Sequence, residues 1–449
     1  MSIADDRIKV RNPKLMFRLF LALLVPFLAF LPAARATDEG PPNDIAANLS
    51  TLGHEPDWSV LEAYQGTITH DEFVQLLNEV YCPHCISPEL IQIEADDARI
   101  LKHKGGHDYF VLHFASDAQK QLPLDRNWTA PAALPAPLAT AGPLSGFHIA
   151  LDPGHLGGPW AKMEERWFQI GNARPIEEGE LTLQVAQLLA PRLQSLGAKV
   201  SLVRAKTEPV TPYRPDDFRA IALEFLHRAG IATPREDFDG PADPEKEKTV
   251  RWQEELMFYR NSEIRRRADL VNYRLQPDLV LCLHFNAEPW GDPTKPTLVD
   301  KNHLHLLVNG SYLKDELDLD DERCEMLRKL LSRSYPEELG LADSLALTMA
   351  KTTGLPPYHY KTENATPVGK SGYVYARNLM ATRLYHCPTV YLEPYVMNSE
   401  EVFARVEAGD YEGTRRVAGK KRPSIFREYV DGVVEGMVAY FKKTRPQPR

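Results

Sequence analysis

The chain has 449 residues, which exceeds the length of one ordinary compact domain, so we expect two or more structural units. An apolar fraction of 43% supplies enough side chains for a hydrophobic core, and a charged fraction of 26% is ordinary for a soluble protein. The formal net charge of −9 argues against a general nucleic-acid binder, because phosphate contacts require clustered Lys and Arg side chains.

The first 36 residues have the pattern of a secretory signal peptide. A basic region at 7–18 precedes an apolar run at 19–34, and an Ala-x-Ala cleavage pattern ends at Ala36. An uncleaved membrane anchor is the alternative, but a span needs about 20 apolar residues, and Pro26 interrupts this shorter run. We therefore expect cleavage after Ala36, no membrane span in the mature chain, and export to the periplasm, the cell envelope or the medium.

Residues 37–121 are predicted to form a small α+β accessory domain. Thr69 and Glu72 make a capping box at the start of an amphipathic helix. The strand-like stretches LIQIEADDARILK and YFVLHF are joined by HKGGHD, which is typical of a hairpin. This region carries no group of residues that indicates catalysis, so we assign it an accessory role.

A Cys-x-x-Cys pair, Cys82 and Cys85, lies in the same region. This spacing fits a redox motif, half of a zinc site or a local disulfide. The chain contains no second Cys-x-x-Cys pair, and no βαβ pattern surrounds this one. We therefore expect either a structural disulfide or two inert thiols.

The Pro- and Ala-rich segment 122–146 is predicted to be a semi-rigid linker, and strand-like and helix-like stretches alternate through 147–449. The alternation predicts an α/β fold with a mostly parallel sheet flanked by helices on both faces. Two long insertions interrupt it, near 206–257 and 288–326, and the acidic run KDELDLDDERCEM in the second predicts a solvated surface. The expected strands are 147–152, 198–204, 278–287, 303–310 and 388–396, and the expected helices are 180–196, 261–276, 340–354 and 427–443.

Polar side chains stand where several of these predicted elements begin or end. His155 follows the first strand, His284 closes the third, Glu393 closes the last, and Glu178 precedes the first helix. Ligands of an open α/β sheet bind beyond the carboxyl ends of the strands, so these four side chains can converge. Two imidazoles and one carboxylate around an open position suit a catalytic zinc ion, and a further carboxylate can move protons. Each residue alone has an ordinary structural explanation, and their joint occurrence predicts the site.

The motifs around these residues resemble those of a known family. From 147 to about 440, the chain is similar to the zinc-dependent N-acetylmuramoyl-L-alanine amidases of the Amidase_3 family, which cleave bacterial peptidoglycan. The similar stretches occur in the family's order: IALDPGHLGG, EGELTLQVAQLLAPRLQSLGAKVSLVR, RADLVN, LCLHFNA and PTVYLEPYVMNSEE. The resemblance implies the zinc amidase fold for 147–449.

The resemblance also implies a role for each matching residue. It makes His155, Glu178 and His284 the zinc ligands and Glu393 the catalytic residue. The choice of Glu178 over its neighbour Glu177 rests on the register of the motif. The implied reaction is hydrolysis of the amide bond between N-acetylmuramic acid and L-alanine by zinc-activated water. In this reaction, Glu393 takes the water proton and returns it to the departing alanine nitrogen.

Three further residues are expected to orient the ligands from behind, namely Asp152, Asn286 and Arg267. Asp152 is equally well explained as a turn residue before Pro153. We expect peptidoglycan as the partner and leave room for an envelope activator protein. The alternatives are a zinc hydrolase with a non-wall amide or peptide substrate, and a non-catalytic cell-wall-binding protein. The presence of all three ligands together with Glu393 favours an enzyme.

Overall fold

The computed structural model describes residues 48–446 except 86, 139, 290 and 293. The predicted signal peptide, 1–36, lies outside the described residues. These described residues form one compact unit, and the division into an accessory domain, a linker and a catalytic domain stays a prediction. Within the described part of the chain, no helix has the length and apolar character needed to cross a membrane.

A central sheet of seven strands in the order β10-β11-β9-β12-β8-β4-β7 organises the described residues. Neighbouring strands are parallel except at two places, where β9 is antiparallel to β12 and β10 is antiparallel to β11. The predicted α/β class with a mostly parallel sheet is therefore confirmed. The strands are β4 (His148–Pro153), β7 (Lys199–Leu202), β8 (Leu279–Leu283), β9 (Leu304–Val308), β10 (Thr366–Val368), β11 (Val374–Ala376) and β12 (Thr389–Pro394).

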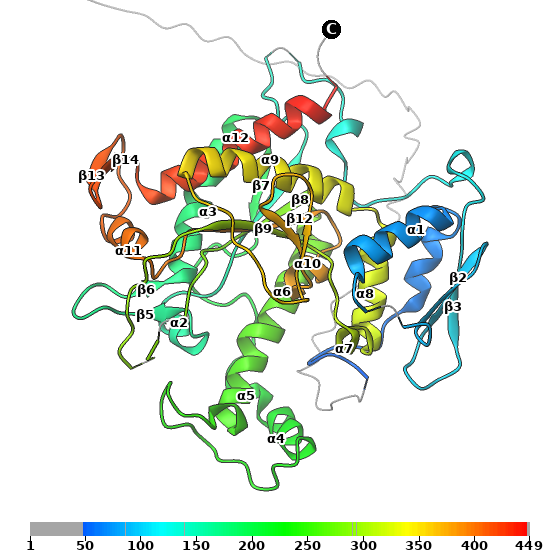
Figure 1. Ribbon diagram of the computed structural model, residues 1–449, viewed down its shortest axis with the longest axis horizontal. Helices are drawn as coiled ribbons and strands as arrows, with labels where there is room; N and C mark the ends of the chain where they lie inside the picture. Colours follow the sequence, from blue (N-terminus) through cyan, green and yellow to red (C-terminus); the bar gives the residue numbers. More distant parts are fainter. Residues whose placement is uncertain (1–47, 86, 139, 290, 293, 447–449) are drawn as a thin grey trace, which may run out of the picture. The chain divides into compact units, whose positions relative to one another are not determined.

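Helices cover both faces of this sheet (Figure 1). Alternate residues of β4 and β8 point to opposite faces, so Ile149 and Leu281 enter one core whereas Ala150 and Val280 enter the other. The larger core is completed by α3 (Glu178–Ser195), α9 (Tyr335–Thr353) and α12 (Ile425–Thr444). The smaller core is completed by α6 (Glu263–Asp269), η8 (Leu270–Leu275) and α10 (Met380–Leu384).

The first part of the described chain forms a small antiparallel sheet with helices. The predicted cap is confirmed, because the Thr69 side chain accepts from the Glu72 amide at the start of α1. The predicted strand LIQIEADDARILK is wrong in its middle, where a turn divides it into β1 and β2. Cys82 and Cys85 are buried free thiols, which matches the expectation of inert thiols. The elements are η1 (Trp58–Tyr64), α1 (His70–Leu76), η2 (Leu77–Tyr81), β1 (Ile91–Ile93), β2 (Asp97–Leu101), β3 (Tyr109–His113) and η3 (Ala118–Lys120).

The Pro- and Ala-rich segment 122–146 packs against the body of the sheet. Trp128 enters the smaller core, and Leu134 and Leu144 enter the larger one. Arg445 follows α12 and donates to the Pro135 and Pro143 carbonyl oxygens. The segment contains one short helix, η4 (Pro131–Ala133).

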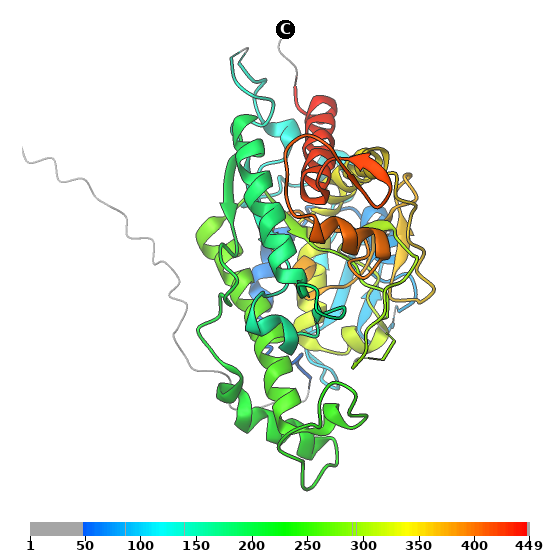
Figure 2. The ribbon, with the colours of Figure 1, turned by 90° about the vertical axis from the view of Figure 1, so that its left-hand side faces the viewer.

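The first insertion folds into helices with a core of their own. Phe218, Ile221 and Phe258 pack there against Leu156 and Trp160, which follow β4. Figures 1 and 2 place α4 and α5 at the end of the molecule opposite α12. The helices are η5 (Pro215–Phe218), α4 (Arg219–Arg228), η6 (Lys246–Lys248) and α5 (Val250–Leu256), which continues through η7 (Met257–Ser262) into α6.

The acidic run at 314–326 falls into two parts: 314–317 form α7 (Lys314–Leu317), where Lys314 and Asp315 are exposed, and 320–326 form the start of α8 (Asp320–Leu331). Asp320, Asp321 and Glu322 are buried, so the prediction of a solvated surface is wrong for the part in α8. Each of these carboxylates has a partner: Arg323 on the same helix bonds Asp320, the distant Ser50 amide donates to Asp321, and the distant Arg383 bonds Glu322. Sequence composition alone does not reveal such partners. The remaining elements are α2 (Pro159–Met163), β5 (Trp167–Phe168), β6 (Ile176–Glu177), α11 (Glu400–Glu407), β13 (Arg415–Val417) and β14 (Lys420–Arg422).

Candidate metal centre

His155, Glu178 and His284 meet at the carboxyl edge of the sheet. Each offers one ligand atom, and these atoms all lie within 4.8 Å of one another. His155 Nε2 is 3.5 Å from Glu178 Oε2, and His284 Nδ1 is 3.1 Å from Glu178 Oε1. The structure therefore brings together the three residues that the sequence singled out as metal ligands.

His155 occupies an unusual backbone conformation. β4 ends at Pro153, and two residues later His155 has a φ of 58°, in the left-handed region that non-glycine residues rarely adopt. Such a conformation persists only where its surroundings impose it. Arg267 supplies one constraint, because its Nη2 donates to the His155 carbonyl oxygen at 3.1 Å. The turn thereby aims the imidazole at α3 and not along the strand.

Gly154 allows the close approach of His284. A Cβ atom at this position would lie 2.0 Å from Cε1 and 2.2 Å from Nε2 of the His284 ring. The Gly154 amide donates to the Leu283 carbonyl, so the two backbones are fixed side by side and neither can withdraw. The glycine of the Asp-Pro-Gly-His motif is thus required by the packing of two candidate ligands.

Glu178 begins α3 and is almost completely buried. Its amide donates to the Arg166 carbonyl, and its Oε1 accepts from the Phe285 amide at 3.1 Å. Burial opposes ionisation of this carboxyl, but the adjacent His155 and His284 hold its pKa below the usual value. Glu177 points elsewhere, since its Oε2 accepts from the Gly158 amide at 2.6 Å. The geometry therefore agrees with the motif register that selects Glu178.

The two imidazoles are oriented by different partners. Glu164 Oε2 lies 2.9 Å from His155 Nδ1 and also accepts from the Leu156 amide, so Nε2 is left facing Glu178. The His284 ring stacks on Tyr391 at a centroid distance of 4.0 Å, and the Tyr391 hydroxyl lies 3.2 Å from its Nδ1. Burial lowers the pKa of His284 to about 4, which favours the neutral ring that a metal needs. Sequence reasoning missed Glu164 and Tyr391.

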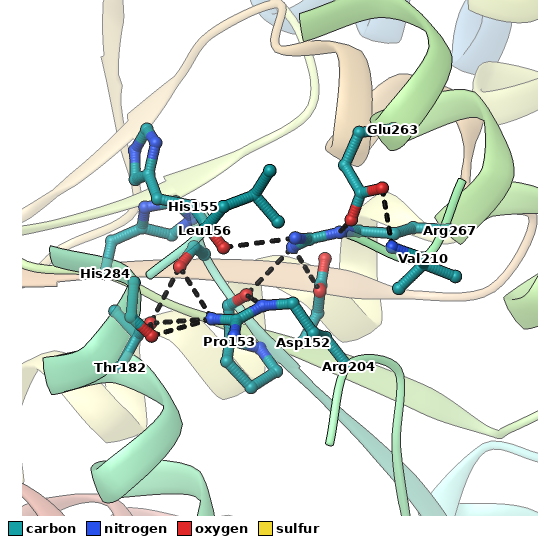
Figure 3. A network of polar contacts seen from close by, with 12 residues as sticks. Asp152, Pro153, His155, Leu156, Thr182, Arg204, Val210, Glu263, Arg267 and His284 are labelled. Atoms are coloured by element: carbon teal, nitrogen blue, oxygen red, sulfur yellow. Dashed lines mark hydrogen bonds and ion pairs between the residues drawn. The ribbon is translucent and has the colours of Figure 1, made fainter. Parts of the chain in front are cut away.

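Asp152 and Arg267 lie beside the backbone that leads to His155, as Figure 3 shows. Arg267 pairs with Asp152 at 3.0 Å and with Glu263 at 2.8 Å, and it also donates to the Pro153 carbonyl. Neither residue touches a ligand side chain; both fix the backbone from which His155 projects. Asn286 lies two residues beyond His284, but its side-chain oxygen accepts from the next amide, so it shapes that loop.

Arg204 is a second buried guanidinium that sequence reasoning missed. It donates to the carbonyl oxygens of Pro153, Gly154 and Gly179 at 2.8–3.3 Å (Figure 3). Burial and the neighbouring Arg267 lower its pKa to about 10. It therefore fixes the end of β4 to the first turn of α3, which carries Glu178.

Glu393 closes β12 beside the group. Leu392 pairs with Leu283 in the parallel register, and the His284 amide donates to the Leu392 carbonyl, so Glu393 lies alongside His284. Burial and the negative charge of Glu178 raise the pKa of Glu393 well above its usual value.

Arg166 adds a positive charge at this edge. Its Nε lies 3.6 Å from Glu178 Oε2, and its charge acts on Glu393 as well. The side chain comes from the segment between α2 and β5, and the sequence pattern there does not indicate a role for it.

The donor atoms fit a catalytic metal. Two imidazoles and one carboxylate converge with buried partners that fix their orientation, and such a set binds Zn²⁺ with one position left open. The fold and this group define an α/β protein with a candidate metal centre at the carboxyl edge of its sheet.

No family model matches the chain, and no curated protein matches it. Among solved structures, similar chains include an N-acetylmuramyl-L-alanine amidase from Mycobacterium smegmatis, with 15% identity and a TM-score of 0.34. The match covers 67% of this chain and 99% of the amidase chain. The catalytic domain of an N-acetylmuramoyl-L-alanine amidase from Bacillus (Paenibacillus) polymyxa var. colistinus has 12% identity and a TM-score of 0.35, covering 66% and 98%. An amidase from Clostridioides difficile, in complex with the GerS lipoprotein, has 11% identity and a TM-score of 0.37, covering 66% and 100%.

We expect Gly154→Ala to disrupt the centre, because the new methyl group overlaps the His284 ring. Overpacking of this kind costs about 1–3 kcal/mol, and displacement of the ring also removes a ligand. The measurements are urea unfolding and zinc content after dialysis. Gly340→Ala is the control, since a methyl group there would meet the Tyr440 ring at 3.0 Å and no candidate ligand. Full zinc content in Gly154→Ala would contradict the geometry.

We expect Glu164→Gln to weaken metal binding roughly 10–100-fold, because it removes the carboxylate that orients His155. Chelator competition measures the affinity without any assay of activity. Glu165→Gln is a matched control, since this neighbouring carboxylate bonds Lys246 and not a candidate ligand. Equal affinities in the two variants would show that Glu164 does not orient His155.

Proposed function

We propose that this protein is a peptidoglycan hydrolase that cleaves the amide bond between N-acetylmuramic acid and L-alanine, with Zn²⁺ held by His155, Glu178 and His284. The observation that carries the proposal is the meeting of these three side chains beside Glu393. The motifs shared with zinc amidases supply the substrate class, and the N-terminal signal pattern fits a wall substrate outside the cytoplasmic membrane.

A zinc ion bound by this group would polarise the scissile carbonyl and lower the pKa of a water molecule. Glu393 is placed to take the proton of the attacking water as its oxygen bonds to the carbonyl carbon. The same residue then gives that proton to the alanine nitrogen as the carbon–nitrogen bond breaks. The products are the lactyl carboxylate on the sugar and a stem peptide with a free amine.

Arg166 has a role in the same proposal. Negative charge develops on the carbonyl oxygen as water adds, and fixed positive groups stabilise it most where water is scarce. The guanidinium of Arg166 lies 3.6 Å from Glu178 and is therefore at the edge of the reacting region. The β5–β6 hairpin holds it there, because the Arg166 carbonyl accepts from the Glu178 amide.

The test is digestion of purified sacculi by the zinc-loaded protein, with mass spectrometry of the released material. Free stem peptides that begin with alanine are the expected product. A chelator should abolish their release and added zinc should restore it. Release of muropeptides cut at any other bond, or no release at all, refutes the amidase proposal.

Glu393→Gln should lower kcat by about 10²–10⁴, because the amide cannot shuttle a proton. Its zinc content should stay at the wild-type level, since Glu393 is not a ligand in the proposal. Glu400→Gln is the control, as this exposed glutamate at the start of α11 lies outside the candidate centre. An active Glu393→Gln variant would remove Glu393 from the mechanism.

A further inference from the structure

Two buried histidines lie next to Glu393 and have no part in the candidate metal centre. His303 precedes β9, and His305 on β9 stands directly opposite Glu393 in the antiparallel register. Directly opposed residues of an antiparallel pair project from the same face of the sheet. His305 therefore lies beside Glu393, on the side away from His284. His303 and His305 are only 7% and 2% exposed.

Each of these imidazoles has one nitrogen without a partner. The Nδ1 atoms of His303 and His305 are buried and form no hydrogen bond within the described residues. Buried polar atoms in folded proteins are paired in the great majority of cases. Two unpaired nitrogens on side chains two residues apart, next to Glu393, therefore point to a partner that binds there.

The contacts of His305 make its free nitrogen a donor. Arg377 Nη1 donates to the Tyr360 hydroxyl oxygen at 3.1 Å, and a guanidinium can only donate. The Tyr360 hydroxyl lies 2.9 Å from His305 Nε2, and because Arg377 occupies an acceptor site of this hydroxyl, we assign its hydrogen to the bond with Nε2. Burial lowers the pKa of His305 to about 3, which keeps the ring neutral. A neutral ring that accepts at Nε2 carries its hydrogen at Nδ1.

The contacts of His303 make its free nitrogen an acceptor. Its Nε2 lies 3.3 Å from Glu288 Oε1. Although burial raises the pKa of Glu288, its bonds to Lys301 and His303 lower it overall, so the carboxylate is ionised and accepts. Burial also lowers the pKa of His303. A neutral ring that donates at Nε2 leaves Nδ1 with a lone pair.

We propose that His303 and His305 form a subsite for amide groups of the substrate, in which the Nδ1–H of His305 binds a C=O and the Nδ1 of His303 binds an N–H. Secondary amides are the groups that offer both. The position rests on the proposed function, since an amide bound here would belong to the molecule that is hydrolysed beside Glu393. The proposed substrate has two sources of this chemistry, the acetamido group of the sugar and the peptide bonds of the stem.

Tyr358 determines how an amide reaches the subsite. Its ring packs 4.6 Å from His303 and 5.1 Å from His305, and it is partly exposed. Both free nitrogens are buried, so in this proposal the Tyr358 ring moves aside when the amide binds. The flat face of the displaced tyrosine is then an apolar wall for the group.

The kinetic test compares His305→Phe, His305→Asn and wild type, all zinc-loaded. The substrates are N-acetylmuramoyl pentapeptide, its de-N-acetylated form and a form with a trans-alkene in place of the first stem peptide bond, which lacks both the C=O and the N–H. Phenylalanine keeps the ring without nitrogen, and the asparagine amide can donate from nearly the Nδ1 position. His359→Phe, at an exposed histidine nearby, is the control.

On the full substrate, His305→Phe should lose about tenfold in kcat/KM, as expected for one hydrogen bond, and His305→Asn should recover most of it. On the analogue that lacks the recognised amide, the kcat/KM of wild type should fall about as far as the substitution lowers it on the full substrate. The kcat/KM of His305→Phe should not fall further on this analogue. The analogue on which wild type and His305→Phe have equal kcat/KM shows whether the recognised amide belongs to the sugar or to the stem peptide. An equal effect of His305→Phe on all three substrates, or none on any, overturns the proposal.

A binding measurement separates this proposal from the proposed function. Nitrogen NMR of the zinc-loaded chain with labelled histidine reports the tautomers directly: hydrogen on Nδ1 in His305 and on Nε2 in His303. N-acetylmuramic acid or an alanyl peptide amide should shift both Nδ1 resonances even if no bond is cleaved. The subsite is refuted if the tautomers are the opposite ones, or if neither probe shifts the Nδ1 resonances at saturation. If both resonances shift but no bond is cleaved, only the amidase proposal is refuted.

Discussion

Two buried guanidiniums fix the end of β4, and the candidate centre depends on them. Arg204 and Arg267 together bind the carbonyl oxygens of Pro153, Gly154 and His155 (Figure 3). The Gly154 carbonyl also accepts from the Thr182 hydroxyl, so the two guanidiniums matter most for the Pro153 and His155 carbonyls and for the left-handed turn at His155. The strand end is thus held in a shape that the local sequence does not favour.

The same cluster is balanced in charge. Asp152 and Glu263 both pair with Arg267, and the Tyr385 hydroxyl donates to the second oxygen of Asp152 at 2.6 Å. A buried charge that loses its partner costs several kcal/mol, so these groups are stable only as a set. Because α6 supplies Arg267 and Glu263, a helix on one face of the sheet determines the shape of the ligand loop at its edge.

The first insertion packs against the loop that follows His155 at the candidate metal centre. Leu156 and Trp160 pack into its core, Trp160 lies 5.3 Å from Phe258, and Lys246 bonds Glu165. These contacts fix α2 and the residues after it, from which Glu164 reaches His155. The loop after the first histidine is therefore held in place by the first insertion.

The strand and helix pattern predicted the sheet, and the rule about strand ends brought the candidate ligands together, whereas the choice of Glu178 over Glu177 needed the motif register. Glu164 was not predictable, because its position depends on the path of a loop. Tyr391 was not predictable either, because in the sequence it is an ordinary strand residue. The buried acids of α8 required partners as distant as Ser50 and Arg383. The pairing of His305 with Glu393 needed the direction and register of β9, and alternation along a strand reveals neither.

Topology, more than side-chain chemistry, assigns different roles to two glutamates at this edge. Glu178 lies at a helix start, where it accepts from the Phe285 amide and meets both imidazoles, so its oxygens are committed to the ligand group. Glu393 stands on β12, one strand beyond His284, and neighbouring strands are about 4.8 Å apart. Because of this spacing between strands, Glu393 lies next to the ligand group without belonging to it. It stands between the candidate metal centre on one side and His305 on the other. A carboxylate in that position can exchange protons with a substrate held on either side.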